Sequence, residues 1–252
     1  MTIDPGWPVV IACVLLLTFT LVMYAVGRLP NARGTAFAAT RAVLQLGLAA
    51  LIITAVIQDL WLSIGLLTVM FAIAVVTTVR RVDAVRAWPW AALSILAGLL
   101  PVITIILLTG TIPLEGIALI PVVGIIAGNT MNAHTLVGRR AFATLREEKP
   151  QYEAALALGL TRSQAICEVA RRRLPEALIP GLDQVRTAGV VTLPGAFIGV
   201  LLGGGSPAQA AAAQILVLIG IMAAQTTTAV VAERFIERAL LLPDDLKVSL
   251  LP

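Results

Sequence analysis

The chain alternates between long apolar runs and short polar intervals. A helix needs about 20 mostly apolar residues to cross the hydrocarbon core of a bilayer, and several runs approach or exceed that length. The apolar runs predict spans at residues 8–26, 35–57, 60–79, 90–109, 116–137, 184–202 and 209–232. We therefore predict an all-α polytopic membrane protein with about seven transmembrane helices.

The longest polar interval, residues 151–175, predicts two short helices joined at a glycine. Strong helix formers come first, and Gly159 follows where a helix end needs a residue that tolerates positive φ. Thr161 and Gln164 then have the spacing of a capping box, which should start a second helix over residues 162–173. A solvated loop that only links two spans is the alternative, since charge runs usually form solvated faces.

The composition excludes an ordinary soluble domain. Of the 252 residues, 59% are hydrophobic and only 13% are charged, and the mean hydropathy is +0.96. Such values are typical of helical membrane proteins. Cys13 and Cys167 fall in a predicted span and in the long polar interval, so they indicate no disulfide framework. Without repeats or boundaries beyond the polar loop, we predict one transmembrane domain over residues 1–252, with that loop at about 139–183.

The placement of Lys and Arg predicts the orientation. Basic residues favour the cytoplasmic side of a membrane, and the first apolar run follows Asp4 and precedes Arg28 and Arg33. We therefore expect a retained first span in the inner (plasma) membrane, with the N-terminus outside and the C-terminal tail in the cytoplasm. With seven spans, every Lys and Arg then lies on the cytoplasmic side except Arg41 and Arg186. Those two lie near the cytoplasmic ends of their spans and can snorkel.

No motif predicts an active site. The chain has one histidine, His134, so a metalloprotease helix, a Ser/His/Asp triad and a His-rich metal site all lack partners. The glycine run at 203–205 precedes Ser-Pro and lacks the lysine of a phosphate-binding loop. We predict no catalytic residue, no cofactor bound by the chain, no assigned metal ligand and no nucleic-acid partner, and hence no enzyme. His134 alone fits an interfacial or hydrogen-bonded residue better than a ligand.

Polar side chains inside the predicted spans are candidates for a translocation path. Amides and charged groups are costly in lipid and usually face a bundle interior or a water-filled cavity. A proline frees a backbone carbonyl, so the sixth span should kink at its mid-span proline. The path candidates are Asn129, Asn132, Thr192 and Pro194, with Arg41 and Gln45 as further members. Arg41 could equally snorkel to phosphate headgroups, and neither it nor His134 is assigned to substrate or to lipid.

Glycines recur at intervals of four in two predicted spans. Small residues at this spacing share one helix face and let helices approach closely. We predict helix packing at Gly124, Gly128, Gly195, Gly199 and Gly203, with substrate contact as the alternative.

Several motifs of the chain resemble known transporter signatures. The sequence Glu153-Ala154-Ala155, with Gly159 four residues on, is similar to the E-A-A-x-x-x-G start of the ABC-importer coupling loop. Nearly the whole chain resembles the FetB family of bacterial inner-membrane proteins. The segments that carry this likeness are 121–131 (PVVGIIAGNTM), 157–159 (ALG), 180–186 (PGLDQVR), 189–199 (GVVTLPGAFIG) and 202–214 (LGGGSPAQAAAAQ).

The FetB resemblance implies a permease subunit of a two-component ABC transporter that exports iron or another metal ion from the cytoplasm. A plant branch of the family is linked to aluminium tolerance. The implied partners are a separate cytoplasmic ABC ATPase, which would bind ATP and Mg, a second permease in a homodimer, and the lipid bilayer. The residues implied in ATPase coupling are Glu153, Ala157, Leu158, Gly159 and Arg162.

Other functions stay open from the residues alone. A secondary transporter or channel for a metal or a small organic solute would need no ATPase, but it would be expected to keep a mid-span Asp or Glu, which this chain lacks. An intramembrane enzyme would need a histidine cluster or a mid-span aspartate pair. A membrane anchor that recruits another soluble protein is a further alternative. So is an importer, because these residues specify neither direction nor substrate.

Overall fold

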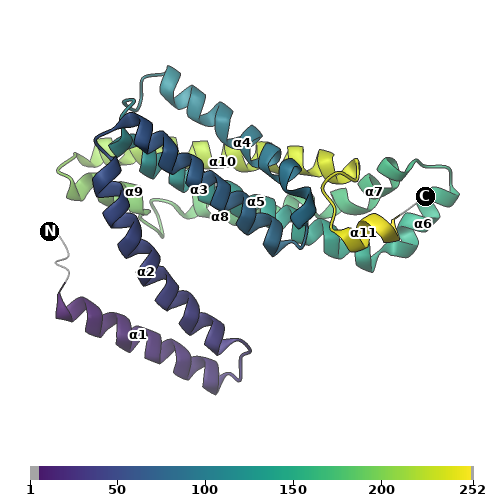
Figure 1. Ribbon diagram of the computed structural model, residues 1–252, viewed down its shortest axis with the longest axis horizontal. Helices are drawn as coiled ribbons and strands as arrows, with labels where there is room; N and C mark the ends of the chain where they lie inside the picture. Colours follow the sequence, from purple (N-terminus) through teal and green to yellow (C-terminus); the bar gives the residue numbers. More distant parts are fainter. Residues whose placement is uncertain (1–5, 251–252) are drawn as a thin grey trace. The chain divides into compact units, whose positions relative to one another are not determined.

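The computed structural model describes residues 6–250, which are helical apart from short connections and one isolated bridge between Ala188 and Thr192 (Figure 1). The long helices are α1 (Trp7–Val26), α2 (Ala32–Val56), α3 (Leu60–Arg81), α4 (Trp88–Leu108), α5 (Gly116–Glu147) and α10 (Pro207–Glu237). The short ones are η1 (Val85–Ala87), α6 (Lys149–Ala157), α7 (Arg162–Ala170), η2 (Arg171–Ala177), α8 (Ile179–Thr187), α9 (Gly195–Leu202) and α11 (Asp244–Ser249). The chain divides into two compact units, Met1–Gln58 and Asp59–Pro252.

Within the described residues, six helices are long and apolar enough to cross a membrane. They are α1, α2, α3, α5, α10 and the continuous segment Val85–Leu108 that contains α4. The prediction of an all-α polytopic membrane protein is therefore confirmed. Five of the seven predicted spans match these helices closely in position, while α5 continues ten residues beyond the predicted end of its span at residue 137.

The first unit is a pair of apolar helices, α1 and α2, joined by a short turn. Arg28 and Asn31 have positive φ in that turn, at 48° and 75°. Neither helix buries any residue, and large apolar side chains such as Phe19 and Leu48 are exposed along them. Such surfaces suit a surrounding of lipid tails or of other protein.

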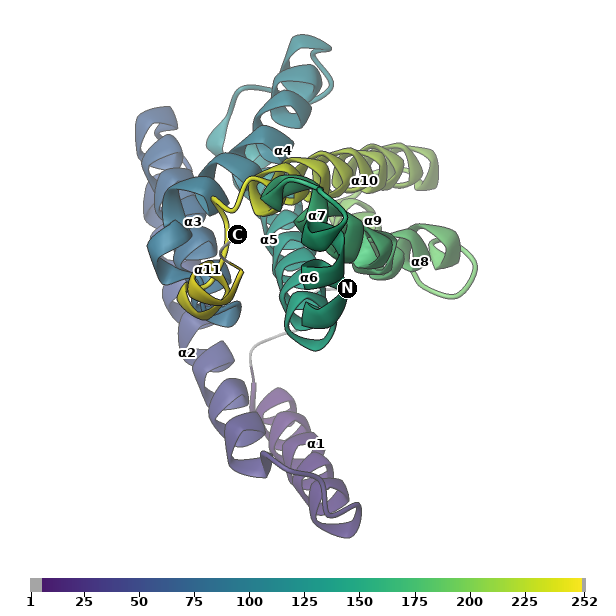
Figure 2. The same ribbon diagram turned by 90° about the vertical axis from the view of Figure 1, so that its right-hand side faces the viewer.

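The second unit is organised around α5. This helix packs against α3, α4 and α10, and Figure 2 shows it between them when the bundle is viewed end on. A close approach joins α4 to α10, because a methyl group at Gly98 would collide with the side chain of Thr228 and the carbonyl of Ala224. The hydroxyl of Thr228 donates a hydrogen bond of 3.1 Å to the carbonyl of Ser94 in the same contact. The missing side chain of Gly98 and the hydrogen bond of the Thr228 hydroxyl thus allow α4 and α10 to pack closely.

The predicted sixth span, residues 184–202, is not a continuous helix. The structure has α8 and α9 instead, separated by a non-helical stretch at 188–194, and neither is long enough to span a bilayer. Gly189 has a φ of +82°, and Pro194 caps α9 in an extended conformation rather than kinking a helix. Proline has no N–H and disfavours helix in the residue before it, so a helix can begin at Pro194 but cannot pass through it at low cost. The prediction of a mid-span kink is therefore wrong.

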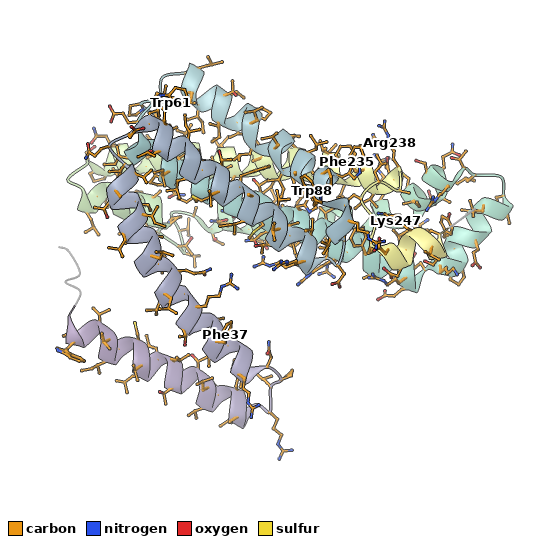
Figure 3. The ribbon with its side chains drawn as sticks, viewed as in Figure 1. Phe37, Trp61, Trp88, Phe235, Arg238 and Lys247 are labelled. Atoms are coloured by element: carbon orange, nitrogen blue, oxygen red, sulfur yellow. The ribbon has the colours of Figure 1, made fainter. Side chains whose placement is uncertain are left out.

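One end of the bundle carries the short helices α6, α7 and α11 and the corner between α3 and α4. We call this end the hairpin end; α3, α5 and α10 finish there and α4 begins there. Figure 3 shows Trp88, Phe235, Arg238 and Lys247 toward this end and Trp61 at the opposite one. The rings of Trp90 and Phe235 stack in a tilted pair, with centroids 5.1 Å apart, and so join the start of α4 to the end of α10.

Candidate functional site: a helical hairpin and the segment that holds it

The hairpin, residues 149–170, consists of α6 and α7 joined at Gly159, as the sequence predicts. Gly159 has a φ of +89°, which a residue without a side chain adopts freely. The amide of Gly159 bonds to the carbonyl of Leu156 at 2.9 Å, and the amide of Leu160 bonds to that of Ala155 at 3.1 Å. These two bonds form a Schellman motif, which satisfies the carbonyls at the end of α6. The chain therefore turns sharply at this glycine.

The second helix of the hairpin starts with the capping box that Thr161 and Gln164 predict. The amide of Thr161 donates to the Gln164 side chain at 2.8 Å, while the Thr161 hydroxyl accepts from the amide of Gln164 at 3.4 Å. The expected end of this helix at residue 173 is wrong, because α7 stops at Ala170. The chain continues as the 3-10 helix η2, which contains Pro175, and proline removes a donor that an α-helix would need.

One face of the hairpin packs against the bundle and the other faces outward. Tyr152, Ala155, Ala165, Ile166 and Val169 are buried on the inner face. Among the residues predicted for coupling, Glu153, Ala157, Leu158 and Gly159 are exposed on the outer face. Leu158 at the corner is 82% exposed, so its side chain is accessible for contact with another protein. Glu153 pairs with Lys149 at 3.5 Å, one turn earlier on the same helix.

Arg162, the fifth residue predicted for coupling, lies differently from the other four. It is half-buried, and its guanidinium donates a hydrogen bond of 3.3 Å to the carbonyl of Lys247. That carbonyl belongs to a segment we call the strap, residues 241–250, which follows α10 and contains α11. The sequence predicts only a cytoplasmic tail for these residues, so their contact with the hairpin is a new finding.

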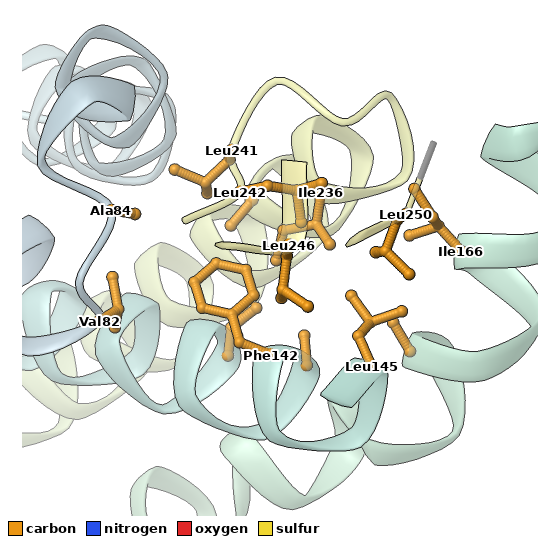
Figure 4. Close-up of a cluster of buried hydrophobic side chains, with 14 of the residues drawn as sticks. Val82, Ala84, Phe142, Leu145, Ile166, Ile236, Leu241, Leu242, Leu246 and Leu250 are labelled. Carbon is orange, nitrogen blue, oxygen red and sulfur yellow. The ribbon is translucent and has the colours of Figure 1, made fainter. Parts of the chain in front are cut away.

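The strap contributes four leucines to the largest buried apolar cluster of the second unit. Leu241, Leu242, Leu246 and Leu250 are all nearly or fully buried. Figure 4 shows them between Val82 and Ala84 of the α3–α4 corner, Phe142 and Leu145 of α5, Ile236 of α10 and Ile166 of the hairpin. The spacing of residues 242, 246 and 250 by four was a signal in the sequence, because it gives one apolar face to a helical turn.

Polar contacts fix both ends of the strap. The hydroxyl of Tyr152 donates a hydrogen bond of 2.8 Å to the carbonyl of Leu250, and burial raises the pKa of this phenol. Arg146 of α5 forms a bidentate pair with Asp245, at 2.7 and 3.1 Å, and these hydrogen bonds hold the pKa of the Asp245 carboxyl below its usual range. Arg86, in the α3–α4 corner, lies 3.5 Å from Asp244.

Two buried carboxylates lie on α10, where this helix packs against α7 and η2. Glu233 and Glu237, one turn apart on α10, line a cavity of about 10 Å³ together with Cys167 and Arg171. Arg171 lies 3.8 Å from Glu233. The pKa of the Cys167 thiol is raised, mainly because the thiol is buried and also because it hydrogen-bonds to Glu237. Over residues 6–250, no group of three or more His, Cys, Asp or Glu side chains could hold a metal ion.

The path candidates of the second unit make separate polar contacts in the structure. Asn129 uses its amide to bond to the carbonyl of Ile125, at 2.9 Å within α5, and Asn132 accepts from Arg81 of α3 at 3.4 Å. Thr192 and Pro194 both lie in the break between α8 and α9, where the Thr192 hydroxyl donates to the carbonyl of Thr187 at 3.4 Å. The assignment of these residues to a path stays a prediction.

Arg41 and Gln45 lie one turn apart on α2, in the first unit. With the Gln45 amide oriented as an acceptor, its oxygen takes two hydrogen bonds from Arg41, at 3.1 and 3.2 Å. His134, on α5, is 1% exposed, and neither ring nitrogen has a hydrogen-bond partner among the described residues. The hydrogen bond expected of His134 is therefore absent among the described residues, while its place relative to the membrane interface stays a prediction.

The glycines predicted for helix packing differ in their surroundings. A methyl group at Gly124 would touch Met70 of α3 at 3.0 Å, whereas one at Gly128, Gly195 or Gly199 would meet no atom within 4 Å among the described residues. A methyl group at Gly203 would approach only the carbonyls of its own helix, the nearer at 3.2 Å. Gly195 and Gly199 instead line an apolar groove of about 870 Å³ between α5, α9 and α10.

Comparison with known proteins gives a family match over most of the chain. The model of an uncharacterised protein family, UPF0014, matches residues 7–241. The UPF0014 membrane protein STAR2 of Oryza sativa subsp. japonica is 32% identical over 199 residues, which cover 78% of this chain and 70% of that protein. The protein ALUMINUM SENSITIVE 3 of Arabidopsis thaliana is 34% identical over 140 residues, 56% of this chain and 51% of that protein.

A third relative carries a functional name. The probable iron export permease protein FetB of Escherichia coli (strain K12) is 32% identical over 130 residues, which cover 52% of this chain and 50% of that protein. No solved structure matches the chain at a significant level.

Proposed function

The chain belongs to the UPF0014 family of membrane proteins, and on that premise we propose that it is the permease subunit of an ABC transporter that exports iron or another metal ion from the cytoplasm. The observation that carries the proposal is the hairpin. Its inner face is buried on the bundle, while the Leu158 side chain is exposed at its corner and a methyl group at Gly159 would meet no atom within 4 Å among the described residues. Such a corner is suited to insert into a groove of a soluble partner.

The charge distribution supports a cytoplasmic hairpin end. Arg80, Arg81, Arg86, Arg139 and Arg140 lie at that end of the second unit, whereas the connections at the opposite end carry only the charges of Asp59 and Glu115. Basic residues accumulate on the cytoplasmic side of membrane proteins. A cytoplasmic ATPase could therefore reach the hairpin directly.

The contacts of the hairpin offer a route for mechanical coupling. The helix α7 packs on α5 and α10, and η2 continues from it along the same two helices. Closure of two ATP-loaded ATPase subunits would displace the hairpin and with it the ends of two long helices, which is a shear or hinge motion of packed elements. Each of the two ATPase subunits needs a hairpin to engage, so we include a permease homodimer in the proposal.

The segment formed by α8, α9 and the break between them is suited to line the route of the transported metal. Non-helical backbone within a membrane is tolerated where it is buried in protein or lines a water-filled cavity, and α8 and α9 are separated by such backbone at 188–194. The break lies beside Gln214 of α10, whose side-chain oxygen accepts a hydrogen bond of 3.2 Å from the amide of Phe197. The metal as cargo is supported by the name of the Escherichia coli relative.

The proposal is tested by binding of a soluble ABC ATPase encoded with this chain. Both proteins are purified together in nanodiscs, and ATP hydrolysis is measured with and without the permease. We expect a stable complex in which the permease changes the hydrolysis rate. A chain that transports Fe²⁺ in vesicles without any ATPase would instead be a secondary transporter or channel, and the proposal would be wrong.

A further inference from the structure

The strap connects parts of the second unit that are far apart in the sequence. Its acidic residues Asp244 and Asp245 pair with Arg86 of the α3–α4 corner and with Arg146 of α5. Its later carbonyls, those of Lys247 and Leu250, accept hydrogen bonds from Arg162 and Tyr152 of the hairpin. One ten-residue segment therefore contacts the corner, α5 and both helices of the hairpin.

The apolar side of the strap joins the same elements. Leu246 and Leu250 lie in a continuous cluster that includes Ile166 of the hairpin and Val82 of the corner (Figure 4). Close-packed interiors transmit displacement because they are not continuously deformable. A push on the hairpin thus has two routes into the bundle: the direct packing of α7 on α5 and α10, and the strap.

We propose that the strap is a positioning element that makes the hairpin and the α3–α4 corner move as one body. This inference rests on the proposed function, because it assigns the strap to the transmission of force from an ATPase. It adds α3 and α4 to the helices that the hairpin drives. The central residues are Tyr152 and Arg162 on the hairpin, Arg146 on α5, and Asp245 on the strap.

The strap lies almost entirely outside the part of the chain that the family model matches. That match ends at residue 241, where the strap begins. The contacts are nevertheless made to residues well inside the matched region, among them Tyr152 and Arg146. The inference therefore concerns an element of this chain and is not carried over from its relatives.

The first test separates coupling from stability. In the complete complex with the ATPase, the double variant Tyr152→Phe/Asp245→Asn removes one hydrogen bond and one ion pair without creating a large cavity. We expect the amount of Fe²⁺ moved per ATP hydrolysed to fall at least about fivefold, the factor that the net contribution of the Tyr152 hydrogen bond alone gives in an equilibrium. Assembly should stay intact, while thermal stability should fall modestly because the Leu250 carbonyl loses its donor. Tyr24→Phe, at the other tyrosine of the chain, and Asp183→Asn, in the exposed Arg186–Asp183 pair within α8, serve as matched controls.

Exchanging the charges of Arg146 and Asp245 tests whether the amount of Fe²⁺ moved per ATP can be rescued. Arg146→Asp/Asp245→Arg should restore much of the ratio that either single variant loses, because the pair is re-formed with its ends reversed. An unchanged ratio in the first double variant, or loss of assembly in place of loss of coupling, would overturn the proposal.

The second test does not depend on transport. Spin labels are attached at Val85→Cys in the corner and Ser163→Cys in the hairpin, both exposed positions, in a chain that carries Cys13→Ser and Cys167→Ser. We expect one narrow distance distribution between these labels, which broadens when Tyr152→Phe/Asp245→Asn is added. A broad distance distribution in the parent chain would refute the proposed role of the strap. If no ATPase engages the chain, the proposed function fails while this distance still reports on the strap.

Discussion

The phenolic hydroxyl of Tyr152 donates a buried hydrogen bond of 2.8 Å to the backbone carbonyl of Leu250, 98 positions further along the chain. Tyr152 is 1% exposed and Leu250 is fully buried, so water cannot replace either partner. A buried carbonyl left without a donor costs more than the bond itself contributes. This contact therefore fixes the hairpin to the strap, and it makes the hairpin part of the core rather than a free loop between two spans.

The conformation of Gly159 predicts a graded response to substitution. Gly159→Ala should lower the free energy of unfolding by about 1 to 2 kcal/mol, because an L-residue at positive φ is strained, although a methyl group there would meet no neighbouring atom. Gly159→Asn should cost less, since asparagine tolerates this region. Thermal unfolding of the two purified variants checks the order. An alanine variant as stable as the parent would contradict it.

The apolar cluster predicts a large effect at Leu246 and a small one nearby. Leu246→Ala should destabilise the protein by about 2 to 5 kcal/mol, because it leaves a cavity in a close-packed core. Val248 lies in the same short helix and is 72% exposed, so Val248→Ala is the matched control and should stay within about 0.5 kcal/mol of the parent. Denaturant titration in detergent measures both. Equal losses at the two positions would show that the strap does not pack as described.

The exposed corner predicts where the ATPase binds. Leu158→Glu places a charge at the centre of the proposed contact and should abolish co-purification with the ATPase, while secondary structure and thermal stability stay as in the parent because the side chain is 82% exposed. Leu114→Glu, an exposed leucine in the connection between α4 and α5, is the control and should leave binding intact. Binding that survives Leu158→Glu would move the docking site away from the corner.

The Arg146–Asp245 pair predicts a defined pH dependence. Hydrogen bonds from Arg146 lower the pKa of Asp245 in the folded chain, so its contribution to stability is present above the ordinary aspartate pKa of about 3.9. It is lost as the pH falls through the lower, folded-state value. The difference in melting temperature between the parent and Asp245→Asn should therefore be constant from about pH 5 to 8 and shrink below about pH 4. Both side chains are half-exposed, so the difference should be small. A difference that grows in acid would contradict this assignment.

Local signals explain what the sequence predicts well. Gly159 and the capping box of Thr161 and Gln164 act through the backbone within a few residues, so the corner of the hairpin could be placed in advance. The long apolar runs likewise identify helices because a bilayer demands that length.

The remaining features depend on contacts across the chain. The burial of the strap leucines needs partners from α5, α7 and the α3–α4 corner, which no local pattern names. The break at 188–194 combines Gly189 and Pro194 with β-branched residues between them, and hydropathy alone reads this mixture as a continuous apolar run. The close contact of Gly98 with Thr228 was missed for the same reason, since glycine spacing does not identify the neighbouring helix.

The most direct test of the proposed function is metal movement in proteoliposomes that contain the permease with its ATPase. Vesicles are prepared with the ATPase facing outward, Fe²⁺ is added outside, and iron in the lumen is measured with ATP, without ATP, and with the Leu158→Glu permease. We expect iron to accumulate in the lumen only with ATP and the parent permease, because export carries the metal away from the ATPase side. Iron accumulation that does not depend on ATP, or ATP hydrolysis without iron accumulation, would contradict the proposed function.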